Sequence, residues 1–165
     1  MSPAPGPTPT PTLWDDAVRR YAAPGVAEAC LALQDAHGQC VPLLLWRLWA
    51  LDQGRPVDGV VLRRAAEAAR AWQGAAIAPL RQVRRRLKDA VAGPPGPQQE
   101  ALRQAVKAAE LEAERQLLAA LEALTPPPAP IRPAADVAAA LAETAAAWGA
   151  PVSRPDLAPL VAAVS

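Results

Sequence analysis

Proline is concentrated in three stretches of this chain, and these stretches limit where regular structure can form. Residues 2–12 alternate proline with small residues, residues 93–97 read GPPGP, and residues 125–133 read TPPPAPIRP. Because proline lacks a backbone N–H, fixes φ and restricts the residue before it, neither a helix nor a central strand can run through such a stretch. The sequence therefore predicts four parts: a disordered Pro/Thr-rich leader at 1–12, a domain at 13–124, a Pro-rich linker at 125–133 and an extension at 134–165.

The residues between these breaks favour helix. The chain is 52% apolar, which is enough to bury a substantial core in 165 residues. Alanine, leucine and valine supply most of that apolar content, whereas phenylalanine is absent and tyrosine occurs once. Sheets are rich in β-branched and aromatic residues, which are sparse here, while alanine and leucine are strong helix formers. We therefore predict an all-α protein.

Three helices are expected in the first third of the chain. Thr12 is a good N-cap for the first helix. The second spans about residues 26–37 and stops at Gly38, which suits the left-handed conformation that follows many helices. The third lies in VPLLLWRLWALDQG, where Gly54 is suited to stop it, and is apolar on nearly every side except at Arg47. We expect this third helix at the buried centre.

Further helices complete the predicted bundle. One follows Asp58, and the next carries Pro79, which either starts it or kinks it. Residues 97–124 then read as one long helix in which apolar residues recur every three or four positions. That stripe is expected in the core of the same chain, with self-association through this helix as the alternative. The prediction is a compact helical bundle of five to six helices, followed by a short helical extension.

Charge and hydropathy narrow the classes of function. The net charge of +1 gives no overall field that would attract nucleic acid or an anionic membrane, so nucleic-acid binding is not expected. The longest fully apolar run, VPLLLW, is far shorter than the roughly 20 residues that cross a bilayer. The first residues show no secretory signal. We expect a cytoplasmic protein without a transmembrane segment.

The stretch ACLALQDAHGQC, residues 29–40, holds the only histidine and both cysteines of the chain. On a helix, Cys30 and His37 lie roughly 10 Å apart, too far to bind one metal ion. His37 and Cys40 would supply only two ligands, so no metal and no cofactor is expected. A nucleophilic Cys40 would need His37 as its base and an acid to orient that base, and the sequence shows no such arrangement directly. No catalytic residue is therefore predicted.

A basic helical face is the strongest candidate for a binding site. Four cations of PLRQVRRRLK, residues 79–88, fall on one side of the predicted helix: Arg81, Arg84, Arg85 and Lys88. Arginine forks match the oxygens of phosphate and carboxylate, so this face could hold an anion. The alternative is a solvated face whose arginines pair with Glu67, Asp35 or the acids of residues 110–114.

The tryptophans of the central segments form a second candidate. Trp46, Trp49 and Trp72 lie in helices predicted to pack together, and each indole N–H needs a hydrogen-bond partner if it is buried. We expect them to fill the core. The alternative is a ligand pocket with Arg47 at its edge.

The leading functional hypothesis is a non-enzymatic binding or interaction module, which uses the basic face for a protein partner or a small anionic ligand. An all-helical enzyme acting on a phosphorylated or anionic substrate is the first alternative, with Glu28, Asp35 or His37 as its acid or base. A weak nucleic-acid binder is the second alternative, although no aromatic residues are interleaved with the arginines.

The order of several short motifs resembles a known family. Trp14 is followed by CLALQ and Gly38, then by LLLW with Trp49, by Trp72 and by PLRQVRRRLK. This order is similar to that of an uncharacterised family of short conserved hypothetical proteins of proteobacteria, over about residues 13–90. The resemblance implies a small cytoplasmic helical protein and supplies no catalytic residues. The leader and the carboxyl-terminal residues lie outside it.

Overall fold

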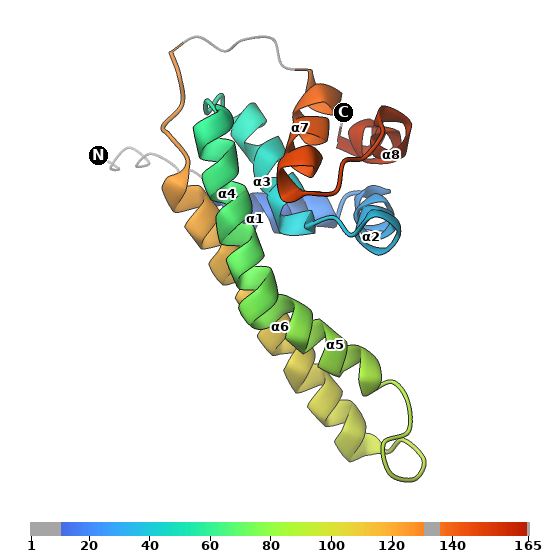
Figure 1. Ribbon diagram of the computed structural model, residues 1–165. Helices are drawn as coiled ribbons and strands as arrows, with labels where there is room; N and C mark the ends of the chain where they lie inside the picture. The colour runs from blue at the N-terminus through green and yellow to red at the C-terminus, as the bar shows by residue number, and fades with distance from the viewer. Residues whose placement is uncertain (1–10, 131–135, 165) are drawn as a thin grey trace, which may run out of the picture.

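The computed structural model describes residues 11–130 and 136–164, and every regular element in these ranges is helical (Figure 1). The predicted all-α class is confirmed. Most of the predicted leader, part of the predicted linker and the first residues of the predicted extension lie outside the described residues. None of the described helices is long and apolar enough to cross a bilayer. The helices are α1 (Leu13–Tyr21), α2 (Val26–His37), α3 (Val41–Asp52), α4 (Gly59–Trp72), a π-helical segment (Gln73–Ile77), α5 (Ala78–Arg86), α6 (Pro97–Leu124), α7 (Val137–Trp148) and α8 (Arg154–Val164).

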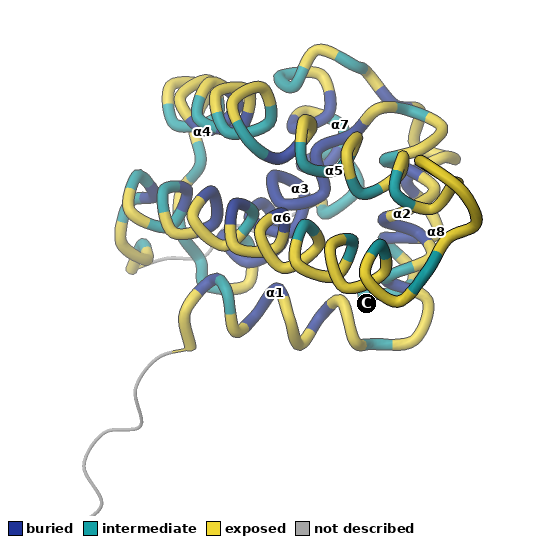
Figure 2. The backbone as a smooth tube through the Cα atoms, turned by 90° about the horizontal axis from the view of Figure 1, so that it is seen from below, coloured by how far each residue is buried: buried dark blue, intermediate teal, exposed yellow. Residues whose placement is uncertain are grey.

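Helix α3 is the centre of the molecule, as its sequence predicted. Residues 41–50 are all buried, and Figure 2 shows this helix as a dark-blue segment enclosed by the others. Pro42 stands in the first turn, where its missing N–H is not needed by the helix. Helices α1, α2, α4, α6 and α7 pack around α3, and all contribute to one hydrophobic core.

Local chemistry sets two helix ends where the sequence predicted them. Thr12 Oγ1 accepts a hydrogen bond from the Asp15 N–H at 3.2 Å, while the Asp15 carboxylate accepts one from the Thr12 N–H at 3.1 Å, which closes a capping box. Gly38 adopts a φ of 61° just past α2, a conformation that glycine reaches without the strain of a side chain. These two ends orient α1 and α2 against the start of α3.

The predicted fourth and fifth helices form one continuous rod, so the described residues hold seven helical segments, against the predicted bundle of five to six helices with a short helical extension. Helix α4 passes into α5 through the π-helical segment, where the N–H of Ala78 bonds to the carbonyl of Gln73, five residues earlier. Pro79 follows directly. Proline cannot donate a hydrogen bond and its ring crowds the carbonyl four residues before it, so one wide turn accommodates it without ending the helix.

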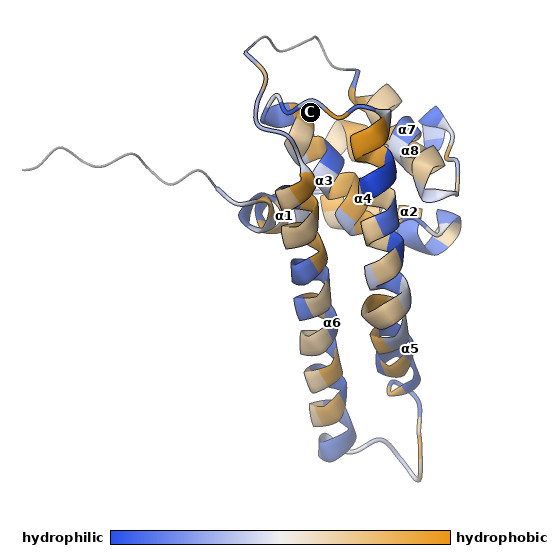
Figure 3. Cartoon of the chain, turned by 60° about the vertical axis from the view of Figure 1, so that its left-hand side comes forward, coloured by the Kyte–Doolittle hydropathy of each residue, from blue (hydrophilic) through white to orange (hydrophobic). Residues whose placement is uncertain are grey.

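The rod and α6 form a long helical hairpin that reaches out from the globular body (Figures 1 and 3). Helix α6 packs against α4, the π-helical segment and α5 in the hairpin, and against α1 and α3 in the body. Its apolar stripe is buried only toward the carboxyl end: Leu117 and Leu121 are fully buried, whereas Leu102 is 54% exposed. The outer half of α6 therefore has fewer neighbours than the sequence pattern indicated. Self-association through residues 97–124 stays a prediction.

The carboxyl-terminal helices complete the core. Leu141 of α7 and Leu157 and Leu160 of α8 are fully buried. Helix α7 packs on α3 and α4, while α8 packs on α2 and α7. Trp148 donates from Nε1 to the carbonyl of Gly38 at 2.8 Å, which ties the end of α7 to the end of α2. The predicted division between a domain at 13–124 and an extension at 134–165 stays a prediction.

Candidate functional site

A groove opens between α1, α2, the start of α3 and the hairpin formed by α5 and α6. Its volume is about 520 Å³, within the range of small-molecule sites. Helix α3 supplies the floor through Val41, Pro42 and Leu45, which are all buried. The walls are formed by Trp14, Ala17, Val18, Tyr21 and Ala22 of α1 and its end, Leu31 and Gln34 of α2, Arg81 and Arg84 of α5, and Lys107, Glu110, Leu111, Glu114 and Leu118 of α6.

Exposed hydrophobic side chains gather at this groove. Eight large hydrophobic side chains of the described residues are exposed, and four of them line the groove: Val18, Tyr21, Leu31 and Leu111. Their exposed fractions range from 38% to 51%. Single exposed apolar residues are normal on a protein surface, whereas a cluster around a cavity is typical of a surface that binds another molecule.

The α1 wall carries a signal that the sequence analysis missed. Leu13 and Ala17 lie on the core side of α1 and are almost fully buried. Trp14, Val18 and Tyr21 recur at steps of four and three on the neighbouring face, and all three line the groove. A helix that packs only on a core needs one apolar stripe. The second stripe on α1 therefore indicates an additional contact surface.

The wall formed by α5 and α6 is a network of charges. Arg81 donates from Nε to Glu110 Oε1 at 2.8 Å and from Nη2 to Glu114 Oε1 at 3.0 Å. Arg84 donates from Nε to Glu110 Oε2 at 2.6 Å. These bonds join residues that lie 26 to 33 positions apart in the chain. Two of the four predicted cations thus pair with acids of residues 110–114, as the alternative reading of that face expected.

The pKa values of the two glutamates of this wall are shifted in opposite directions. Burial opposes the ionisation of Glu110, but the hydrogen bonds from Arg84 and Arg81 outweigh it and lower the pKa of Glu110. At Glu114, burial is the largest influence and exceeds the attraction of Arg81, so the pKa of Glu114 is raised. A carboxyl group whose ionisation is resisted in a cleft is a candidate functional group.

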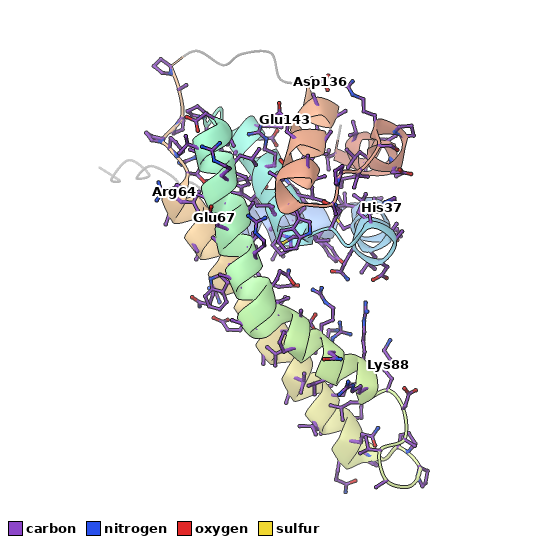
Figure 4. All side chains as sticks on the ribbon, in the orientation of Figure 1. His37, Arg64, Glu67, Lys88, Asp136 and Glu143 are labelled. Atoms are coloured by element: carbon purple, nitrogen blue, oxygen red, sulfur yellow. The ribbon has the colours of Figure 1, made fainter. Side chains whose placement is uncertain are left out.

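Arg85 and Lys88 lie away from the charged wall. Arg85 donates from Nη2 to Asp35 Oδ1 of α2 at 3.0 Å, and both side chains are more than half exposed. Lys88 follows α5 on the outer part of the hairpin (Figure 4) and makes no ion pair with any residue that the structure describes. The predicted four-cation face is therefore divided, since Arg81 and Arg84 line the groove and the other two cations do not.

The acid and base candidates of α2 do not meet at the groove. His37 Nε2 lies 4.0 Å from Asp156 Oδ1 of α8. Glu28 is exposed, and Asp35 pairs with Arg85. None of the three α2 candidates lines the groove. Within residues 11–130 and 136–164, no group of three or more potential ligands is placed to hold a metal ion.

The three tryptophan candidates lie in the body, outside the groove lining. Trp46 is fully buried and donates from Nε1 to Thr125 Oγ1 at 2.7 Å. Trp49 is buried beside Arg55, whose guanidinium carbon lies 4.7 Å from the centre of the indole ring. Trp72 is half-buried against the same core. Their placement fits the core-packing expectation better than a ligand pocket.

Arg47, a residue of α3, is buried where α3 packs against α7. Its Nη2 lies 3.3 Å from Glu143 Oε2 of α7, the residue labelled in Figure 4, and its Nη1 donates to the Val57 carbonyl at 3.4 Å. Burial lowers the pKa of Arg47. Arg47 therefore links α3 to α7 and is not among the residues that line the groove.

Both cysteines are packing groups. Cys30 is 0% exposed and Cys40 is 2% exposed. Burial raises the pKa of Cys30 to about 12 and that of Cys40 to about 11. Because the thiolate is the nucleophile, neither thiol is activated at neutral pH. The nucleophile interpretation of residues 29–40 gains no support from this geometry.

Comparisons with known proteins point to a family without an assigned role. The model of a family described as a protein of unknown function (DUF2390) matches residues 12–121, about two thirds of the chain. Neither the curated proteins nor the solved structures gave a match. The matched residues include α1 to α5 and most of α6, and therefore every residue that lines the groove.

Proposed function

We propose that this chain, which belongs to the DUF2390 family of proteins of unknown function, acts by binding a ligand in the groove between α1, α2, α3, α5 and α6. The observation that carries the proposal is the cluster of four exposed hydrophobic side chains around a cavity of about 520 Å³. Burying apolar surface yields about 25 cal/mol for each Å². A molecule that covers these side chains therefore gains affinity from their burial.

Binding accounts for this arrangement better than catalysis does. The two thiols are held protonated, and His37 lies beside α8 instead of at the groove. The wall arginines are fixed by ion pairs, which gives the groove the preformed polar groups of a binding site. We place this role in the cytoplasm, where two buried free cysteines stay reduced.

The groove includes half of the basic face from the sequence hypothesis. Arg81 and Arg84 line it, so an anionic ligand is retained as a candidate there. A protein partner on the outer part of the face has weaker support, because Arg85 is already paired with Asp35. Nucleic-acid binding has weaker support still, since the net charge is only +1 and phosphate contacts require free cations.

Two leucines of α6 provide a matched test. Leu111 and Leu102 are 51% and 54% exposed, and of the two only Leu111 lines the groove. The wild-type chain should bind the neutral dye N-phenylnaphthylamine saturably, measured by its fluorescence. Leu111→Asp should weaken binding at least about tenfold, because it sets a charge against the apolar dye.

Leu102→Asp is the control and should leave the affinity for the dye unchanged, with circular dichroism showing that both variants are folded. Equal losses in the two variants would mean that the dye binds outside the groove. That result, or a wild-type chain without saturable binding, would refute the proposed function.

A further inference from the structure

We propose that the groove holds a free single-chain amphipathic anion, with its charged head against Arg81, Arg84 and Lys107 and its apolar chain along α1 and α6. This inference rests on the proposed function, since it names the occupant of the same groove. It is supported by the charge balance of the wall, by the hydrogen-bond donors left free on it and by the dimensions of the groove.

The charged lining of the groove has one cation in excess. Arg81, Arg84 and Lys107 stand against two acids, Glu110 and Glu114. Lys107 is exposed and forms no ion pair within the described part of the chain. The excess charge attracts an anion and repels a cation, and it acts more strongly beside apolar walls than in open water.

The hydrogen-bonding groups of this wall also favour an anion. The bonds from Arg81 and Arg84 to the glutamates use only Nε and Nη2, so Nη1 of each arginine donates to none of the described residues. A guanidinium presents five N–H donors in a planar fork that matches carboxylate or phosphate oxygens. Both oxygens of Glu110 are already occupied. The wall therefore has more free donors than free acceptors.

The dimensions of the groove suit an extended chain. On α6 the lining runs from Lys107 to Leu118, about 16 Å at a rise of 1.5 Å per residue. An extended chain of about ten carbons fits within that length, and a volume of about 520 Å³ is typical of a small-molecule site. The apolar lining along this length, including Trp14 and Leu118, suits the body of such a chain.

Three ligands with one apolar chain and different heads test the assignment. Isothermal titration calorimetry of the full chain would compare decanoate, decanol and decyltrimethylammonium, with the two ionic ligands below their micelle concentrations and decanol below its solubility limit. Decanoate should bind at least about tenfold more tightly than decanol, because it adds charge-assisted hydrogen bonds to the same apolar contact. Decyltrimethylammonium should bind more weakly than decanol.

The outcomes separate this inference from the proposed function. If decanol and decanoate bind equally, the groove still binds apolar molecules and only the anion assignment is overturned. If none of the three binds, while the neutral dye binds in a manner that depends on Leu111, the single-chain ligand class is overturned and the groove stands. If the dye test fails as well, both fail.

A matched pair of lysines locates the head group. Lys107 and Lys88 are both exposed and form no ion pair among the described residues, but Lys88 does not line the groove. Lys107→Glu should weaken decanoate binding at least about tenfold, since it replaces an attraction by a repulsion. Lys88→Glu should leave it unchanged. Equal losses would assign the effect to net charge and overturn the placement of the head.

A further variant, at Glu114, is expected to bind decanoate more tightly than the wild type, and misfolding cannot explain a gain in affinity. Glu114→Gln removes a carboxylate that competes with the ligand for Arg81, and it should tighten decanoate binding about threefold. Unchanged or weaker binding would contradict the placement of the head.

Vesicles of dioleoylphosphatidylglycerol carry a lipid anion in a membrane. Binding to these vesicles by a chain that ignores free decanoate would assign the groove to a membrane surface and overturn the proposal.

Discussion

Glu110 is the side chain through which the two helices of the hairpin are joined beside the groove. It is 6% exposed and accepts hydrogen bonds from Arg81 and Arg84. A buried carboxylate without such partners would be strongly unfavourable. Because these bonds lower the pKa of Glu110 in the folded chain, the ionised group stabilises the fold above its unfolded pKa. That stabilisation is lost as the pH falls through the folded pKa.

Glu110→Gln should therefore lower the free energy of unfolding by about 2 kcal/mol at neutral pH. The difference from the wild type should shrink as the pH falls below the unfolded pKa of a glutamate, about 4.3, and through the lower pKa of Glu110 in the folded chain. Urea denaturation across a pH series measures both effects. Glu112→Gln is the control. Glu112 is exposed and bonds only to Gln116, so this substitution should change the free energy of unfolding by less than about 0.5 kcal/mol. A cost at Glu110 that does not vary with pH would contradict the role of the ion pairs.

Among the helical elements, the π-helical segment determines which side of α5 meets α6. An α-helix turns about 100° per residue, so the one extra residue in the wide turn rotates all of α5 by that amount relative to α4. With this rotation, Arg81 and Arg84 reach α6. A short irregularity thus places the charged wall of the groove.

Deleting Ala75, an exposed residue of this segment, should restore α-helical bonding and turn Arg81 away from Glu110. Glu110→Gln should then cost less than about 0.5 kcal/mol in the shortened chain, against about 2 kcal/mol in the full chain. Free energies of unfolding for the four proteins give this double-mutant cycle. Deletion of Ala92, in the loop between α5 and α6, is the matched control and should leave the cost unchanged. If Glu110→Gln costs as much in the chain without Ala75 as in the full chain, the two changes are additive, and α5 keeps its orientation without the wide turn.

For the molecule as a whole, the family match and the hydrophobic core do not end at the same residue. The match stops at residue 121, yet Leu141, Leu157 and Leu160 are fully buried. Helix α7 covers α3 and α4, and α8 covers α2. The helices that form the floor and one wall of the groove are therefore supported from behind by segments outside the match.

A chain that ends at Pro130 should lose its cooperative thermal unfolding transition. Each fully buried leucine contributes about 2 kcal/mol, so the loss of three approaches the total stability of a small domain, roughly 5–15 kcal/mol. Scanning calorimetry of the truncated and full chains measures the effect. Cooperative unfolding near the full-length temperature would instead support a self-sufficient domain at residues 13–124 with a separable extension.

Much of the fold could be predicted because it depends on neighbours in sequence. Thr12 caps α1 through a residue three positions away, and Gly38 ends α2 through its own backbone freedom. The apolar run of α3 predicts its central position, because nearly every side of this helix is apolar and is stabilised by burial. The continuous rod was harder to predict: Pro79 was a visible irregularity, but a proline can start, kink or widen a helix, and its packing partners decide among these.

The candidate site depends on contacts between residues far apart in the sequence, which the periodicity of a single helix cannot predict. Arg81 meets acids 29 and 33 residues away, so the sequence could suggest the pairing without saying which arginines take part. Arg85 reached Asp35 on another helix, which divided a face that looked uniform. The apolar side of the groove could have been recognised in the sequence from one local feature, the second apolar stripe on α1, which contains Trp14 and Tyr21.

The enclosure of both native thiols makes this chain a convenient host for site-directed probes. With Cys30 and Cys40 sealed in the core, a maleimide or nitroxide reagent meets no native target on the folded chain. A cysteine introduced by Leu31→Cys at the rim of the groove would be its single attachment point. Spectra recorded from that position would report occupancy of the groove without prior removal of the native cysteines, and so without opening voids where they pack.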